Sequence, residues 1–190
     1  MTTTARLANR VGVGPRALES MRRGVWIFFA VTIAGAAFDL FTKWWAVERL
    51  PKLGLVTLTE RLGLLLVFNH GTAGGYSVGE HTMLFNIIVM SLVLVAVTLC
   101  NIMLSGIDAW SAVPMGMIAG GGWGNLASVV AGPTGVPDFL AWQRDSGSMV
   151  IFNVADVVLW FGCALLIPIG IRLARLLQGD QRDVRSLLRL

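Results

Sequence analysis

The sequence predicts an all-α membrane protein with four transmembrane helices and a small extracytoplasmic β-rich or amphipathic segment between the first and second helices. Hydrophobic residues make up 55% of the 190 residues and charged residues only 14%, whereas about a quarter of the residues of a soluble domain are charged. The mean hydropathy is +0.72. Four apolar runs are long enough to cross a hydrocarbon core of about 30 Å.

Arginine is concentrated at the two ends of the chain. Because basic flanks of membrane helices stay in the cytoplasm, both termini are predicted to be cytoplasmic, which requires an even number of crossings. The adjacent apolar spans explain these arginines, so no nucleic-acid partner is predicted. They are Arg6, Arg10, Arg16, Arg22 and Arg23 near the N-terminus and Arg172, Arg175, Arg182, Arg185 and Arg189 near the C-terminus.

One integral membrane domain is predicted over residues 1–190. It consists of a cytoplasmic basic N-terminus at 1–24, a four-helix membrane domain at 25–171 and a cytoplasmic basic C-terminus at 172–190. The apolar run that follows residue 24 is too long for a cleaved signal peptide, so it is predicted to be retained as a span.

The cysteines and histidines predict neither a disulfide nor a metal site. Cys100 and Cys163 fall within apolar runs and are interpreted as small buried hydrophobes. His70 and His81 have no partner at metal-ligand spacing. No cofactor or metal is therefore predicted.

The first span, residues 25–45, contains an acid and a base four positions apart. Asp39 precedes Lys43, so the two side chains can form an ion pair on one face of the helix. Near the membrane boundary this pair either anchors the helix, with Lys43 reaching toward the headgroups, or supports a functional site. The sequence leaves both interpretations open.

Residues 46–82 change character and favour short strands on the membrane surface, because apolar and β-favouring residues alternate there with polar ones. The segment contains Asn69-His70-Gly71, followed by two further glycines. Glycines beside an asparagine predict a backbone turn that approaches another group closely, with a plain surface loop as the alternative.

The second and third spans, residues 83–104 and 112–131, are joined by a short connector and are predicted to be antiparallel neighbours. Asn125 is the strongly polar side chain at the outer end of the third span. Small residues recur every fourth position along this span and predict close contact with a neighbouring helix. They are Gly116, Gly120, Gly124, Ser128 and Gly132.

The fourth span, residues 149–171, contains Asn153 and Asp156, which are predicted to lie on one face of a membrane helix. Asp156 is expected roughly 10 Å below the start of this helix. An acid in a membrane span is costly unless it is neutralised, paired or facing water, so it is a functional candidate. The outer loop that precedes this span, residues 132–148, contains a second acid, Asp138.

Asp138 and Asp156 are predicted to meet at the outer membrane boundary. Two neighbouring carboxyls in a low-dielectric environment share a proton, which leaves one carboxylate to take a proton from water and one acid to donate. This is the chemistry of aspartic proteases. Asn69, Asn125 and Asn153 could orient the acids or bind an oxyanion and the substrate backbone.

Five short motifs, in this order and spacing, resemble those of the bacterial lipoprotein signal peptidases (signal peptidase II). They are Asp39-Leu-Phe-Thr-Lys43, Phe68-Asn-His-Gly71, Gly121-Gly-Trp-Gly-Asn125, Gly135-Val-Pro-Asp-Phe139 and Phe152-Asn-Val-Ala-Asp156. The resemblance implies a membrane aspartic endopeptidase of the bacterial cytoplasmic (inner) membrane. Its partners would be membrane lipid and diacylglyceryl-modified prolipoproteins, whose signal peptides it removes.

The resemblance also implies roles for individual residues. Asp138 and Asp156 would be the catalytic pair, while Asn69, Gly71, Asn125 and Asn153 would line the site. Asp39 and Lys43 would support it structurally.

The chain departs from the family pattern after Asn125. The family usually has an Asp-Arg pair three and four positions further on, where this chain has Ser128 and Val129. An arginine can bind substrate backbone through two parallel hydrogen bonds, which valine cannot do. The alternative to a peptidase is therefore a homologue recruited as a binding or structural subunit of a larger membrane complex. A small transporter is a third hypothesis, disfavoured because no inverted repeat is present.

Overall fold

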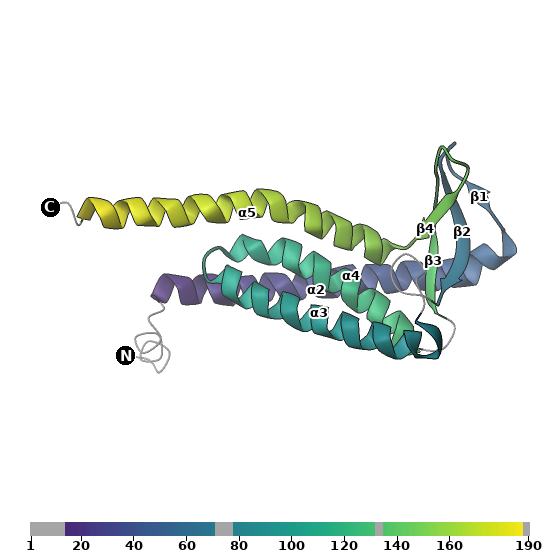
Figure 1. Cartoon of the computed structure of the whole chain (residues 1–190), viewed down its shortest axis with the longest axis horizontal. Helices are drawn as coiled ribbons and strands as arrows, with labels where there is room; N and C mark the ends of the chain where they lie inside the picture. Colours follow the sequence, from purple (N-terminus) through teal and green to yellow (C-terminus); the bar gives the residue numbers. More distant parts are fainter. Residues whose placement is uncertain (1–13, 71–77, 132–134, 188–190) are drawn as a thin grey trace.

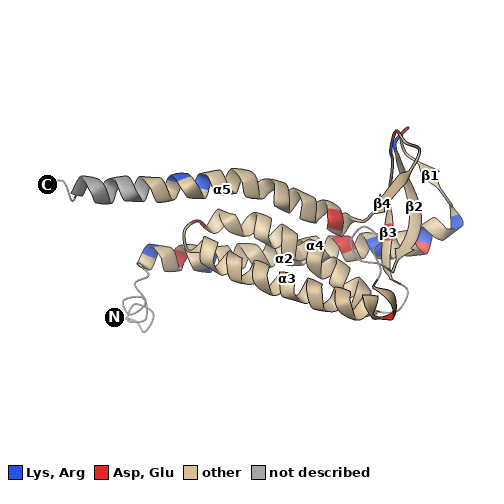
Figure 2. Ribbon diagram, viewed as in Figure 1, with Lys and Arg blue, Asp and Glu red and all other residues tan. Residues whose placement is uncertain are grey.

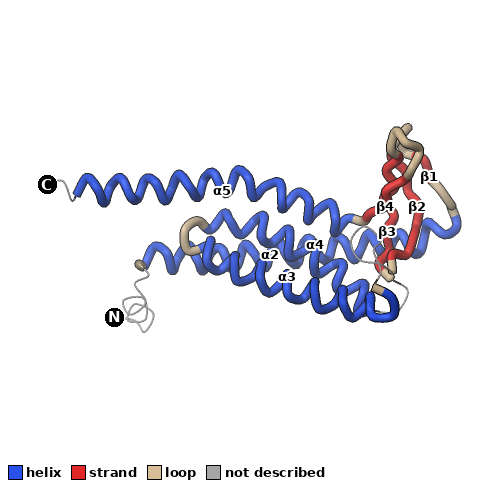
Figure 3. The backbone as a smooth tube through the Cα atoms, viewed as in Figure 1, coloured by secondary structure: helices blue, strands red, loops and turns tan. Residues whose placement is uncertain are grey.

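Four long helices lie side by side, and a small sheet covers one end of the bundle (Figure 1). The computed structural model describes residues 14–70, 78–131 and 135–187, and side chains as far as residue 178. The helices are α2 (Pro15–Arg49), α3 (Thr82–Ser105), α4 (Ala112–Ala131) and α5 (Val154–Leu187). Figure 3 shows the separation of helices and strands clearly. The predicted fold class is confirmed.

Three of these helices contain segments long and apolar enough to cross a membrane, namely Pro15–Lys52, Gly79–Ser105 and Val154–Gln178. The remaining long helix, α4, has 20 residues, which corresponds to a length of about 30 Å. It is rich in glycine because it packs against the other three helices rather than mainly against lipid. Acidic and basic residues gather toward the two ends of the bundle and in the sheet (Figure 2).

The third predicted span coincides with α4 and the second nearly coincides with α3. The first helix begins earlier than predicted, at Pro15, because proline is well suited to the first position of a helix and leaves the following residues free to continue it.

The sheet has four antiparallel strands in the order β1-β2-β3-β4. Strands β1 (Val56–Thr57) and β2 (Leu62–Asn69) lie in the segment predicted to form strands. Strands β3 (Val136–Gln143) and β4 (Met149–Phe152) were not predicted: β3 lies in the segment expected to be an outer loop, and β4 replaces the expected first turn of the fourth span. Pairing of β2 with β3 places Val67 opposite Asp138 and Asn69 opposite Val136.

The glycine positions of α4 are where other elements touch its backbone. A Cβ atom at Gly116 would lie 2.9 Å from the Phe28 carbonyl oxygen, and one at Gly120 would lie 3.0 Å from that of Thr32. Both contacts are with α2, so the predicted close approach is confirmed there. Gly132 lies outside the described residues.

Two apolar clusters hold the bundle and the sheet together. The larger lies between the helices and includes Phe28, Leu94 and Met115. The smaller consists of Ala46, Leu50 and Phe139, and it fixes β3 over the end of α2. Phe139 is the residue after Asp138 in β3, so this packing sets the position of that acid.

The end of the bundle opposite the sheet is closed by the short helix η3 (Ala109–Ser111) between α3 and α4. Asp108 accepts a hydrogen bond from the Trp110 amide and forms an ion pair with Arg172 of α5.

The prediction that the cysteines are buried is wrong. Cys100 and Cys163 are free and exposed on the outside of the bundle. The outward faces of α3 and α5 are also apolar, so a position within an apolar run does not show that a side chain is buried.

Candidate active site

The acids predicted from the sequence meet in one cavity between the sheet and the helix ends. This cavity has a volume of about 310 Å³ and is lined by residues of β2, β3, β4, α3, α4 and α5. Asp138 enters it from β3 and Asp156 from the first turn of α5. The lining residues are Asn69, Asn86, Met90, Asn125, Val129, Val136, Asp138, Val150, Ile151, Phe152, Asn153, Asp156 and Trp160.

Asn153 links the two acids. Its side-chain Nδ2 donates to Asp138 Oδ1 at 2.6 Å, and its backbone N–H donates to Asp156 Oδ2 at 3.1 Å. The Asp156 N–H in turn donates to Asn153 Oδ1 at 3.1 Å. This reciprocal pattern is a capping box, in which the residue before the helix and one in its first turn satisfy each other's backbone donors.

The capping box corrects the predicted position of these two residues. Asn153 lies outside the membrane helix, whereas Asp156 lies within it but at its start. Asn153 precedes α5, and Asp156 is in its first turn rather than about 10 Å below its start. The apolar residues before Asn153 belong to β4, so the acid stands where the helix meets the sheet.

Asn125 of α4 is the second asparagine in contact with the acids. Its Nδ2 donates to Asp156 Oδ1 at 3.1 Å, and its Oδ1 accepts from Asn153 Nδ2 at 3.1 Å and from Lys43 Nζ at 2.7 Å. Asn69, at the end of β2, donates to Asp138 Oδ2 at 3.2 Å. Gly71, the other predicted lining residue of that segment, lies outside the described residues.

Asp39 and Lys43 form the predicted ion pair, with 2.7 Å between Asp39 Oδ2 and Lys43 Nζ. Their side chains are 0% and 4% exposed, so the pair does not act as an anchor in the headgroups. Asp39 Oδ1 instead accepts from the Ala155 N–H at 2.7 Å, within the first turn of α5. The pair therefore lies behind the cavity, against the first turn of α5.

Asp138 is 5% exposed. Burial is the largest influence on its carboxyl and raises its pKa to about 6. The hydrogen bond from Asn153 lowers this pKa, whereas the negative charge of nearby Asp156 raises it. An acid with such a pKa is protonated in part of the population near neutral pH, which suits a proton donor.

Sequence reasoning missed the contribution of α3 to the cavity. Asn86 is 7% exposed and lines the cavity one turn into α3, with Met90 one turn further along. A buried asparagine within an apolar helix was the available signal. Val129, which is 6% exposed, lines the wall next to Asn125.

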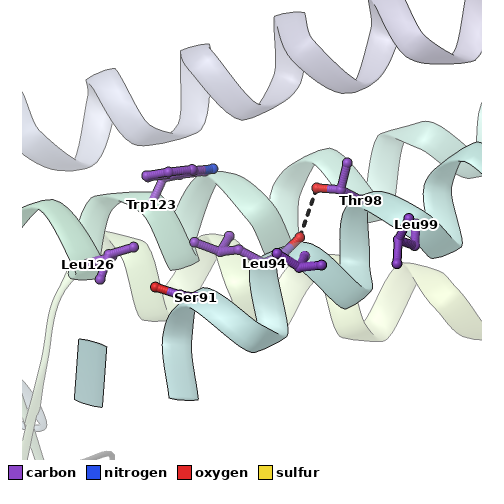
Figure 4. Close-up of a pocket in the computed structure, with 7 residues that line it drawn as sticks. Ser91, Leu94, Thr98, Leu99, Trp123 and Leu126 are labelled. Carbon is purple, nitrogen blue, oxygen red and sulfur yellow. Dashed lines mark hydrogen bonds between the residues drawn. The ribbon is translucent and has the colours of Figure 1, made fainter. Parts of the chain in front are cut away.

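A second cavity, of about 280 Å³, lies between α3 and α4 (Figure 4). Its lining is apolar apart from Ser91 and Thr98, and Thr98 Oγ1 donates to the Leu94 carbonyl oxygen within α3. No titratable side chain lines it, so it offers no proton-transfer chemistry.

The fold and the site together define a multi-pass membrane protein with two acids in a cavity at one end of a helical bundle. The chain belongs to the signal peptidase II family, because the family model described as Signal peptidase (SPase) II matches residues 31–172. It is accordingly a multi-pass bacterial membrane protein of a protease family.

Two relatives are both named lipoprotein signal peptidase. The protein of Dichelobacter nodosus (strain VCS1703A) is 29% identical over 148 residues, which cover 74% of this chain and 90% of that protein. The protein of Pelagibacter ubique (strain HTCC1062) is 28% identical over 116 residues, which cover 60% of this chain and 69% of that protein.

Two solved structures share the fold. Both are described as bacterial membrane enzyme structures obtained by the in meso method, at 2.3 and 1.9 Å resolution. The first has a TM-score of 0.64 at 22% identity and covers 76% of this chain and 87% of the other. The second has a TM-score of 0.62 at 23% identity and covers 74% and 89%.

Proposed function

We propose that this chain is a membrane aspartic endopeptidase that removes the signal peptides of diacylglyceryl-modified prolipoproteins, with Asp138 and Asp156 as its catalytic pair. The observation that supports this most strongly is the convergence of the two acids on one cavity, joined through Asn153. The lipoprotein signal peptidase relatives suggest the substrate class.

The proposed reaction needs one carboxylate and one carboxylic acid. The carboxylate takes a proton from a water molecule that attacks the scissile carbonyl, and the acid donates to the carbonyl oxygen. Asn69, Asn125 and Asn153 orient the acids through the hydrogen bonds described above. The cavity lies where the helices end, so a peptide bond at the membrane surface reaches it while the apolar signal peptide stays in lipid.

The test is cleavage of a purified diacylglyceryl-modified prolipoprotein by the purified full chain in detergent. Asp138→Asn and Asp156→Asn should each lower kcat by roughly 100-fold or more. Asp145→Asn is the matched control, because Asp145 is an 85% exposed acid paired with Arg61 away from the cavity. Unchanged cleavage by either cavity variant would contradict the proposal.

One observation favours a second candidate, a binding or structural subunit of a membrane complex. Val129 forms the cavity wall where the family usually has an arginine, so a group that binds substrate backbone is replaced by an apolar surface. Absence of cleavage by the wild type, together with co-purification in fixed stoichiometry with other membrane proteins, would support this candidate instead.

A further inference from the structure

Lys43 fixes the orientation of the Asn125 side-chain amide. The distance from Lys43 Nζ to Asn125 Oδ1 is 2.7 Å, and an ammonium group can only donate hydrogen bonds. The amide oxygen must therefore face Lys43. The NH₂ group is left facing Asp156, whose Oδ1 lies 3.1 Å from Asn125 Nδ2.

A backbone amide fixes Asn153 in the same way. The Asp156 N–H donates to Asn153 Oδ1 at 3.1 Å, so the NH₂ group of Asn153 is directed to Asp138 Oδ1 and Asn125 Oδ1. Neither asparagine can be turned over without placing a donor against a donor.

The surroundings of the two acids are unequal although each accepts two N–H groups, Asp156 from Asn125 Nδ2 and the Asn153 backbone, and Asp138 from Asn153 Nδ2 and Asn69 Nδ2. Asp156 lies in the first turn of a helix, which favours a negatively charged side chain. Asp138 lies outside the helix and is more deeply buried, and burial raises its pKa to about 6. The shared proton therefore belongs on Asp138.

We propose that Lys43 is a positioning residue that acts through Asn125 to keep Asp156 as the carboxylate that activates water, with Asp138 as the proton donor. This assignment rests on the proposed function. The water oxygen bonds to the scissile carbonyl carbon while its proton passes to Asp156 and the Asp138 proton passes to the carbonyl oxygen. The C–N bond then breaks as Asp156 protonates the leaving amine and a hydroxyl proton returns to Asp138.

A purely structural role for Lys43 is the competing explanation, since it neutralises the buried Asp39. Removing Lys43 alone would leave that charge buried without a partner, and the chain could fail to fold. The test is therefore made with Asp39→Asn present throughout. The side-chain oxygen of Asn at this position can still accept from the Ala155 N–H, which is 2.7 Å from Asp39 Oδ1 in the wild type.

Two double variants separate the explanations. Asp39→Asn with Lys43→Gln keeps an N–H donor for Asn125, whereas Asp39→Asn with Lys43→Met keeps a similar length without a donor. We expect the Met pair to have a kcat/KM about 10- to 100-fold below that of the Gln pair, because Asn125 Oδ1 then keeps only the donor from Asn153 Nδ2 and the Asn125 N–H is held less firmly against Asp156.

The pH profile gives a readout that a structural role would not move. The acidic limb of kcat/KM should lie at higher pH in the Met pair, because Asn125, whose N–H stabilises the charged form of the general base, has lost the donor that orients it. The titratable groups that interact electrostatically with Asp156 in the described residues are Asp138 on β3 and Asp39 and Lys43 on α2. Asp138 is unchanged in both variants, position 39 is Asn in both, and position 43 is uncharged in both. The midpoints of thermal unfolding in detergent show whether the two double variants are equally stable.

Equal rates and equal acidic limbs in the two double variants would overturn the positioning role and leave Lys43 as a partner of Asp39 only. A lower rate and a shifted limb in the Met pair support it. Failure of the proposed function is seen separately, because the wild-type chain would then not cleave the prolipoprotein.

Discussion

Asn153 does two things at once. Its side chain and backbone cap the start of α5, and its NH₂ group binds Asp138. Asn153 begins the helix that carries Asp156 and binds Asp138 of the neighbouring strand β3, so it links the two acids. Geometry at this position therefore couples the stability of the fold to the arrangement of the site.

Asn153→Ala should lower both stability and activity. The lost cap and the unsatisfied donors around it should cost about 1–3 kcal/mol in the free energy of unfolding, and kcat should fall because Asp138 loses its shortest hydrogen bond. Asn101→Ala is the matched control, because Asn101 is a buried asparagine of α3 that accepts from Ser105. The control should lose stability and keep its kcat; loss of kcat in both would argue against a specific role.

Asp138 should make stability depend on pH. Its pKa rises from 3.8 to about 6 on folding because it is buried, so the folded chain keeps a proton that the unfolded chain has already released between these values. The free energy of unfolding should therefore fall by roughly 3 kcal/mol as pH rises from about 4 to about 7. Thermal unfolding should show less of this fall in Asp138→Asn than in the wild type or in Asp145→Asn; equal falls in all three would contradict the expectation.

At the scale of elements, α4 is the helix on which the other three pack. A Cβ atom at Gly121 would lie 2.4 Å from the Ala155 carbonyl oxygen of α5, and one at Gly124 would lie 2.3 Å from Asp39 Oδ2 of α2. Gly121 and Gly124 thus let α5 and Asp39 of α2 lie directly against α4, next to Asn125.

Gly124→Ala should displace Asp39 and separate α2 from α4. We expect a loss of about 1–3 kcal/mol in stability, as for other overpacked sites, together with reduced cleavage. Gly170→Ala in α5 is the control, because a Cβ atom there meets nothing within 4 Å and alanine favours a helix over glycine by up to about 1 kcal/mol. Thermal unfolding in detergent distinguishes the two variants, and equal midpoints would show that α4 adapts.

The sequence predicted the helices well and the sheet only in part. Long apolar runs identify α2, α3 and α5 by length alone. Strand β4 could not be recognised in this way, because Met149–Phe152 is as apolar as the helix that follows it. The capping box of Asn153 and Asp156 marks its end, but the spacing of three residues fits one face of a helix equally well.

The site was predicted by residue type rather than by geometry. The spacing of Asp39 and Lys43 correctly predicted their ion pair. It could not predict that the pair is buried, because burial depends on the approach of α4 and α5 to that face of α2. Asn86 was missed for a similar reason, since only the folded chain brings α3 to the cavity.

At the scale of the whole molecule, the sheet and the far end of the bundle are expected on opposite sides of the membrane. The arginines of the described N-terminal and C-terminal helix ends, among them Arg16, Arg22 and Arg175, predict by the positive-inside rule that those ends are cytoplasmic. We then expect the cavity to open on the extracytoplasmic side.

Labelling of single cysteines tests this orientation in a background in which Cys100 and Cys163 are replaced by serine. Ser146→Cys, in the exposed turn between β3 and β4, should react with a membrane-impermeant maleimide in intact spheroplasts. Glu19→Cys, near the start of α2, should react only after the membrane is permeabilised. The reverse pattern would invert the topology.

The sheet is assembled from two stretches that are far apart in the chain, since β2 precedes α3 and β3 follows α4. Asp138 takes its place only when these strands pair, with Val67 opposite it. If Asp138 acts as proposed, activity therefore requires this strand pairing in addition to the association of the helices. Mild denaturation should disrupt the pairing of β2 with β3 first, so cleavage should be lost before the helical content falls.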